Sequence, residues 1–95
     1  MKNNAKFGNY IQSLRKGKQL TLKVVADELA IDISMLCKIE NGERQVNSIV
    51  LRKIANFFDL DYKELQIHFL SKKILHEFQN EPFIINAMGN CINSL

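Results

Sequence analysis

The stretch from Thr21 to Gly42 reads TLKVVADELAIDISMLCKIENG, and its spacing decides the fold. Its first half predicts a helix that starts after the N-cap Thr21 and carries the small residue Ala26 on its buried face. Its second half predicts a helix that starts after Asp32 and closes at Gly42, because glycine adopts the left-handed conformation that ends a helix. The connection between the two helices is tight, so the segment predicts two crossed helices, the second projecting from the body.

A further helix is expected on the N-terminal side, over residues 4–16, because apolar residues recur at i, i+4 and i+7 from Phe7. Gly17 is expected to end it. This end of the chain is basic, since residues 1–23 hold six basic and no acidic side chains, whereas the remainder holds seven basic and ten acidic ones. Such asymmetry can mark a face that meets a polyanion, although on this evidence alone an unevenly charged solvated surface is the commoner explanation.

Three more helices are expected on the C-terminal side. Asn47 or Ser48 caps the first of them, and Asp61 caps a long helix over residues 62–79. Pro82 suits the first turn of a last helix. Helical spacing runs through nearly the whole chain without alternating strand patterns, so the fold class is all-α.

The long helix over residues 62–79 changes its apolar face along its length. At 100° per residue its first half carries Leu65 and Phe69 on one arc, and its second half carries its apolar residues on a roughly opposite arc. The second arc needs a cover, which we expect from the C-terminal segment together with a second copy of the chain. The residues assigned to this dimer interface are Leu70, Ile74, Phe78, Phe83, Ile84 and Ile85.

The composition of the whole chain sets outer limits. Its 95 residues are 46% hydrophobic and 24% charged, which is typical of one globular domain. There is no run of about 20 apolar residues for a membrane span, and the N-terminus lacks the apolar core of a signal peptide, so a cytoplasmic protein without membrane contact is expected. Cys37 and Cys91 are expected to be free thiols.

Catalytic and metal-binding patterns are absent from the sequence. It has no phosphate-binding glycine loop, and His68 and His76 stand eight residues apart, which is not a ligand-pair spacing. We therefore expect no enzyme activity, no cofactor, no metal and no small-molecule ligand. A helical domain of this size is also expected to lack room for a sizeable pocket.

Residues 7–65 resemble the phage-repressor and Cro type of helix-turn-helix protein, the XRE family. The resemblance rests on joint spacing, carried among others by Ile11, Arg15, Leu20, Thr21, Val25, Ala26, Leu29, Ile31, Ser34, Leu36, Ile39, Glu40, Asn41, Gly42, Leu51, Ile54 and Phe58. It implies a five-helix lambda-repressor-like DNA-binding domain over residues 1–66. The remainder of the long fifth helix and an extra C-terminal helix would then form an extension over residues 67–95, which is expected to serve dimerisation.

The resemblance also implies a transcriptional regulator that binds double-stranded DNA as a homodimer on a two-fold related operator. The helix over residues 33–41 would lie in the major groove. Carried over by position, the base-reading residues are Ile33, Ser34, Cys37 and Lys38, and the phosphate-binding residues are Thr21, Lys23, Asn41, Arg44 and Gln45. Arg15 and Glu40 match a pair that forms an ion pair between the first and third helices of this family.

Three features depart from the family pattern. Leu22 stands where glutamine is frequent, Ala30 stands where the turn usually has glycine, and Asp32 and Ile33 offer no side-chain donor at the start of the third helix. This apolar and acidic start supports an alternative function, a protein-interaction module or an antitoxin with the same fold. A phage repressor, a restriction–modification controller and an antitoxin are not separated by the sequence.

Overall fold

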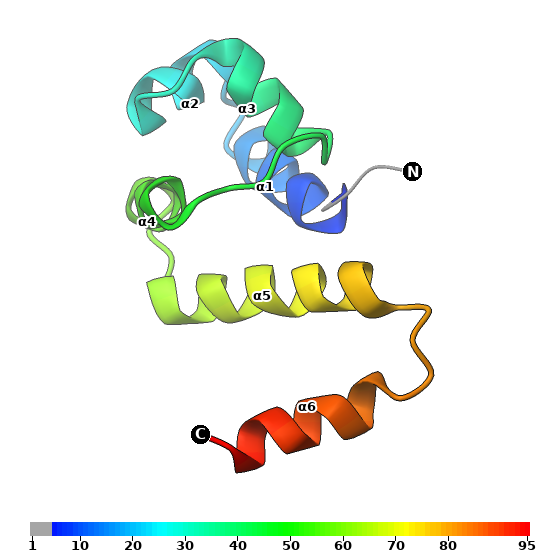
Figure 1. The fold of residues 1–95 in the computed structure, drawn as a ribbon. Helices are drawn as coiled ribbons and strands as arrows, with labels where there is room; N and C mark the ends of the chain where they lie inside the picture. The colour runs from blue at the N-terminus through cyan, green and yellow to red at the C-terminus, as the bar shows by residue number, and fades with distance from the viewer. Residues whose placement is uncertain (1–4) are drawn as a thin grey trace.

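The structure, a computed structural model, describes residues 5–95 and is all-helical over that range, which confirms the predicted fold class. The helices are α1 (Ala5–Gly17), α2 (Leu22–Leu29), α3 (Ile33–Glu40), α4 (Ser48–Phe57), α5 (Tyr62–Phe78) and α6 (Ile84–Asn93). Figure 1 shows α5 between two layers, with α1 to α4 on one side of it and α6 on the other. The expected start of α1 at residue 4 lies outside the described residues.

Side-chain caps fix where four of these helices begin. Thr21 Oγ1 accepts a hydrogen bond from the Val24 amide at 3.2 Å, and Asp32 Oδ1 accepts one from the Met35 amide at 2.6 Å. Asn47 caps α4 and Asp61 caps α5 in the same manner. Each cap satisfies an amide that has no acceptor inside its helix, so the four predicted N-termini are confirmed.

The end of α1 and the start of α6 differ from expectation. Gly17 remains helical, and the chain turns two residues later at Gln19, whose φ is 57°. The Leu20 amide then donates to the Arg15 carbonyl at 3.1 Å, so a non-glycine residue closes the helix. Pro82 lies in the turn before α6 and not in its first turn, because α6 begins only at Ile84.

One hydrophobic core joins α1 to α5. Its fully buried side chains include Phe7, Ile11, Val25, Leu29, Leu36, Ile39 and Ile54. From α5 it receives Leu65 and Phe69, as the first apolar arc predicts. The second arc stays uncovered, since Leu70, Ile74 and Phe78 keep 36–44% of their surface exposed.

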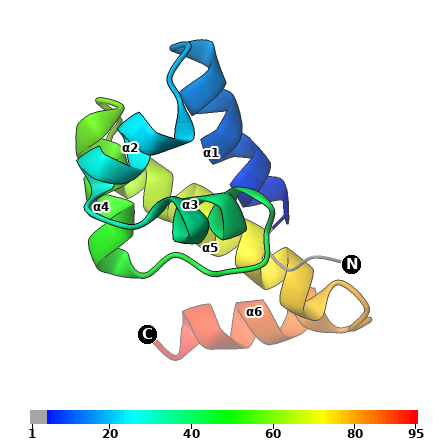
Figure 2. The ribbon, with the colours of Figure 1, turned by 90° about the horizontal axis from the view of Figure 1, so that it is seen from above.

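The last helix adds little to this core. Figure 2, together with Figure 1, shows α6 running back beside α5, yet no residue of α6 is buried. Phe83 and Ile85 are 74% and 79% exposed, and Ile84 is half-buried. Within residues 5–95, no helix has both the length and the hydrophobicity that crossing a bilayer requires.

Candidate nucleic-acid interface

The third helix is held by one face and open on the other. Leu36 and Ile39 point into the core, packed between α1 and α2. At 100° per residue, Ser34 and Lys38 lie on the opposite face, and both are exposed. Ile33 is 44% exposed at the start of the helix. Three of the four predicted base-reading residues therefore lie on the solvent side of α3.

A glycine in α1 permits α3 to approach closely. A Cβ atom added to Gly8 would lie 2.4 Å from the Ile39 carbonyl oxygen and 2.5 Å from that of Glu40. Both atoms belong to the backbone, so any larger residue would push α3 away from α1. Sequence reasoning missed this role, although Gly8 stands three residues before Ile11 and seven before Arg15, which places it on the buried face of α1.

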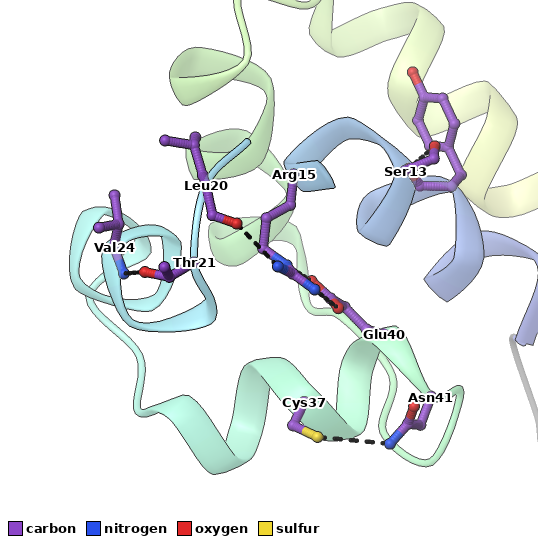
Figure 3. A network of polar contacts seen from close by, with 9 residues as sticks. Ser13, Arg15, Leu20, Thr21, Val24, Cys37, Glu40 and Asn41 are labelled. Carbon is purple, nitrogen blue, oxygen red and sulfur yellow. Dashed lines mark hydrogen bonds and ion pairs between the residues drawn. The ribbon is translucent and has the colours of Figure 1, made fainter. Parts of the chain in front are cut away.

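An ion pair ties the two helices at the same place. Arg15 Nε donates to Glu40 Oε2 at 2.8 Å and Arg15 Nη2 donates to Glu40 Oε1 at 3.0 Å, a two-point contact with both residues buried (Figure 3). The hydrogen bonding that the guanidinium donates to the Glu40 carboxylate is the main reason that the pKa of Arg15 is raised above its ordinary value, against the opposing effect of burial. The structure thus brings together the two residues that the family resemblance paired.

The same guanidinium holds a third element. Arg15 Nη1 donates to the Leu20 carbonyl at 2.9 Å (Figure 3). Leu20 directly precedes Thr21, the cap of α2, so one side chain connects the end of α1, the start of α2 and the end of α3. This carbonyl contact was not predicted, because a backbone acceptor carries no signal in the sequence.

Two predicted DNA-contacting residues interact with each other. Asn41 Nδ2 donates to the Cys37 sulfur at 3.6 Å, and both side chains are half-buried (Figure 3). The sulfur is therefore turned toward the end of α3. This contact orients the Asn41 amide and leaves its oxygen without a hydrogen bond to any residue that the structure describes.

The start of α2 provides backbone donors. The amides of Leu22 and Lys23 precede the first hydrogen-bonded turn and so have no acceptor within the helix, while the Thr21 hydroxyl is engaged as the cap. Lys23 Nζ lies 3.1 Å from Asp27 Oδ2, but both side chains are about 70% exposed. Such a surface pair contributes only about 0.3–0.5 kcal/mol, so a phosphate can replace the carboxylate.

The loop between α3 and α4 is held in place at both ends, on either side of two exposed residues. Gly42 has a φ of 78°, and the amide of the next residue donates to the Lys38 carbonyl at 2.8 Å. Val46 is buried. Arg44 and Gln45 lie between these anchors and are exposed, so the structure holds both next to the end of α3.

The remaining predicted residues lie apart from this surface. Figure 1 shows the α5–α6 side, which carries the proposed dimer residues, across the molecule from α3. No group of His, Cys, Asp or Glu side chains in the described part of the chain could hold a metal ion. An open surface depression lies beside α5, between Tyr10, Asp61 and His68, and no predicted DNA-contacting residue lines it.

Comparison with known proteins identifies a family and a similar solved structure. A family model described as a helix-turn-helix domain matches residues 8–66. The crystal structure of the restriction-modification controller protein C.AhdI from Aeromonas hydrophila is similar, with a TM-score of 0.60 and 31% sequence identity. That similarity covers 64% of this chain and 92% of the controller protein. No curated protein matches the chain in sequence.

Proposed function

The chain belongs to the helix-turn-helix family of XRE type, a family of DNA-binding transcriptional regulators, and from this we propose that it binds a two-fold related operator as a homodimer. In this proposal α3 lies in the major groove of each half-site. The protein works in the cytoplasm and has no catalytic role.

The observation that carries the proposal is the contrast between the two faces of α3. Its inner face is fixed to α1 through the Gly8 contact and the Arg15–Glu40 pair, whereas Ser34 and Lys38 on its outer face are free of other elements. A helix that is rigidly held and exposed along one side can enter the major groove without reordering. The Lys38 ammonium can donate to guanine O6 and N7 there.

Phosphate contacts would surround this helix. The free amides at the start of α2 lie on one flank, and Arg44 and Gln45 lie at the other end of α3. Backbone amides and basic side chains in these places fix the register of a protein on the duplex without reading sequence. They should also make binding depend steeply on salt.

The similarity to a controller protein favours one kind of locus. Since C.AhdI is a restriction-modification controller, we propose that this chain regulates transcription at a restriction–modification locus in preference to a phage or toxin–antitoxin locus. A protein-interaction role is the second candidate, and it is favoured by Val24 and Ile33, which are apolar yet 44% exposed beside the predicted DNA surface.

Salt dependence separates these two functions. Fluorescence anisotropy of labelled DNA from the upstream region of its own coding sequence should show affinity falling linearly on a log–log plot between 50 and 200 mM salt, by about three decades or more for six or more phosphate contacts. Lys38→Ala should weaken DNA binding. The control Lys63→Ala changes an exposed lysine on α5 and should leave DNA binding unchanged. Absence of binding at 50 mM salt would favour the protein-interaction role.

The homodimer is proposed to use the uncovered arc of α5 together with the start of the C-terminal segment, within an extension over residues 67–95. Support comes from α6, which leaves Leu70, Ile74 and Phe78 exposed and buries none of its own residues. Pairing there would leave α3 of each copy uncovered, since the two surfaces lie on different sides of the molecule (Figure 1).

Sedimentation at micromolar concentration tests this interface. The wild type should sediment as a dimer and Ile74→Glu as a monomer, because a carboxylate would be buried in an apolar contact. The matched variant Ile49→Glu changes an apolar residue on α4 that is 65% exposed, and it should remain dimeric. A monomeric wild type would rule out this part of the proposal.

A further inference from the structure

An acidic side chain stands at the end of α3 that would enter the groove first. Asp32 is exposed and has the extended backbone of an N-cap, with φ −80° and ψ 162°. Its Oδ1 accepts the Met35 amide at 2.6 Å, which fixes the carboxyl group over the first turn. Its Oδ2 forms no hydrogen bond with any residue in the described range. One carboxylate oxygen is therefore held in place and left open to an outside donor.

The chemistry of the major groove selects what that oxygen can bind. A carboxylate only accepts hydrogen bonds, and among base edges only adenine N6 and cytosine N4 donate them. Adenine also presents the acceptor N7 beside N6, while guanine and thymine present acceptors at the corresponding positions. Cytosine is thus the base whose major-groove edge offers a hydrogen-bond donor to a carboxylate and has no acceptor beside that donor.

We propose that Asp32 is a specificity-determining residue that accepts a hydrogen bond from the N4 amino group of a cytosine, once in each half-site. The inference rests on the proposed function, since it requires α3 in the major groove. There the first residues of a recognition helix contact base edges. The sequence indicates only that Asp32 lacks a hydrogen-bond donor; the structure shows that it keeps an open acceptor.

The position of Lys38 makes the two residues complementary. Six residues of α-helix span about 9 Å, which corresponds to between two and three base-pair steps of about 3.4 Å. Asp32 and Lys38 therefore reach different base pairs, one as an acceptor and the other as a donor. The negative charge of Asp32 also opposes the phosphates, so it should weaken binding to every sequence that lacks the cytosine.

The test is selection of bound sequences from random DNA with wild type, Asp32→Asn and Asp32→Ser. Asparagine and serine both cap helices, so both variants should keep α3 and melt close to the wild type. In Asp32→Asn the side-chain oxygen remains the acceptor for the Met35 amide, and the NH2 group, which only donates, takes the place of the open oxygen. Asp32→Asn should therefore exchange cytosine for a base with an acceptor edge, guanine above all, at one position of each half-site, with about a tenfold change in relative affinity. Asp32→Ser should lose the cytosine preference at that position. The control Asp59→Asn removes the same charge from the turn before α5 and should leave every base preference unchanged.

Two results would overturn the inference, and they are distinguishable. If the wild type enriches an operator and Asp32→Asn enriches the same one with only a uniform gain in affinity, Asp32 does not read a base, and the proposed function stands. If the wild type enriches no sequence at all, the proposed function fails and this inference fails with it.

Discussion

Removing the carboxylate of Glu40 should destabilise the whole domain, and the structure indicates by how much. In Glu40→Ala the Arg15 guanidinium loses both hydrogen bonds to the carboxylate and keeps only the one to the Leu20 carbonyl. Its side chain is only 11% exposed, so bulk solvent reaches the guanidinium poorly. Breaking a buried pair on one side typically costs about 3–5 kcal/mol.

That cost is large beside the stability of the domain. At about 0.05–0.15 kcal/mol per residue, a chain of this size is stable by roughly 5–14 kcal/mol. A loss of about 3 kcal/mol should lower the melting temperature by about 12–24 °C. DNA affinity should fall as well, because the guanidinium orients both α3 and the start of α2.

Thermal unfolding followed by circular dichroism measures this directly. Glu28→Ala removes an exposed acid from α2, and its free energy of unfolding should lie within about 0.5 kcal/mol of the wild-type value. The double variant Arg15→Met/Glu40→Leu should recover most of the stability, since well-packed apolar residues can replace a buried pair. The reasoning would be refuted if Glu40→Ala had the same melting temperature as Glu28→Ala. It would also be refuted if the double variant were no more stable than Glu40→Ala.

Three further outcomes can be measured on the same protein. Gly8→Ala should lower the melting temperature, because overpacking against backbone costs about 1–3 kcal/mol and outweighs a helix-propensity gain of about 1 kcal/mol. Gly17→Ala should raise the melting temperature, because nothing lies within 4 Å of the added atom. A higher melting temperature in both variants would contradict the close contact between Gly8 and α3. Burial, and then the charge of Lys72, lower the pKa of His68 in the folded protein. The imidazole therefore binds a proton more readily in the unfolded chain than in the folded one. Stability should therefore fall as the pH drops below about 6.5, and His68→Phe should flatten that slope in urea titrations at pH 7.5 and 5.5; an unchanged slope would exclude His68 as its source. In binding-site selection, Lys38→Ala should relax specificity at one base pair per half-site, whereas Arg44→Ala should weaken all sequences alike and reduce the salt slope by about one; a uniform loss for Lys38→Ala would remove it from base reading.

Local chemistry explains why much of this fold was predictable. Thr21, Asp32, Asn47 and Asp61 all cap the helices that follow them, and a cap needs only an acceptor side chain at the right offset from an amide. The two arcs of α5 were likewise readable, because burial of Leu65 and Phe69 follows from 3.6-residue periodicity. Both kinds of inference depend on residues within one or two turns.

What the sequence did not reveal depends on distant contacts or on backbone atoms. The role of Gly8 exists only because α3 crosses α1 at that point, and the Leu20 carbonyl has the same chemistry in any residue. Gln19 and Asp59 adopt left-handed conformations without being glycine, with φ of 57° and 55°. The hydrogen bonds and packing around each turn impose that conformation, so side-chain preference alone misplaced the end of α1.

Ala30, between α2 and α3, has φ 56° and ψ 41°, a left-handed conformation that costs alanine about 1 kcal/mol more than glycine. Its methyl group also narrows the backbone angles open to the joint between the two helices. A stiff joint loses little freedom when the protein docks, but it cannot open to follow a groove of different width. In the proposed complex with DNA, the protein should therefore adapt poorly to altered duplexes and discriminate among DNA shapes.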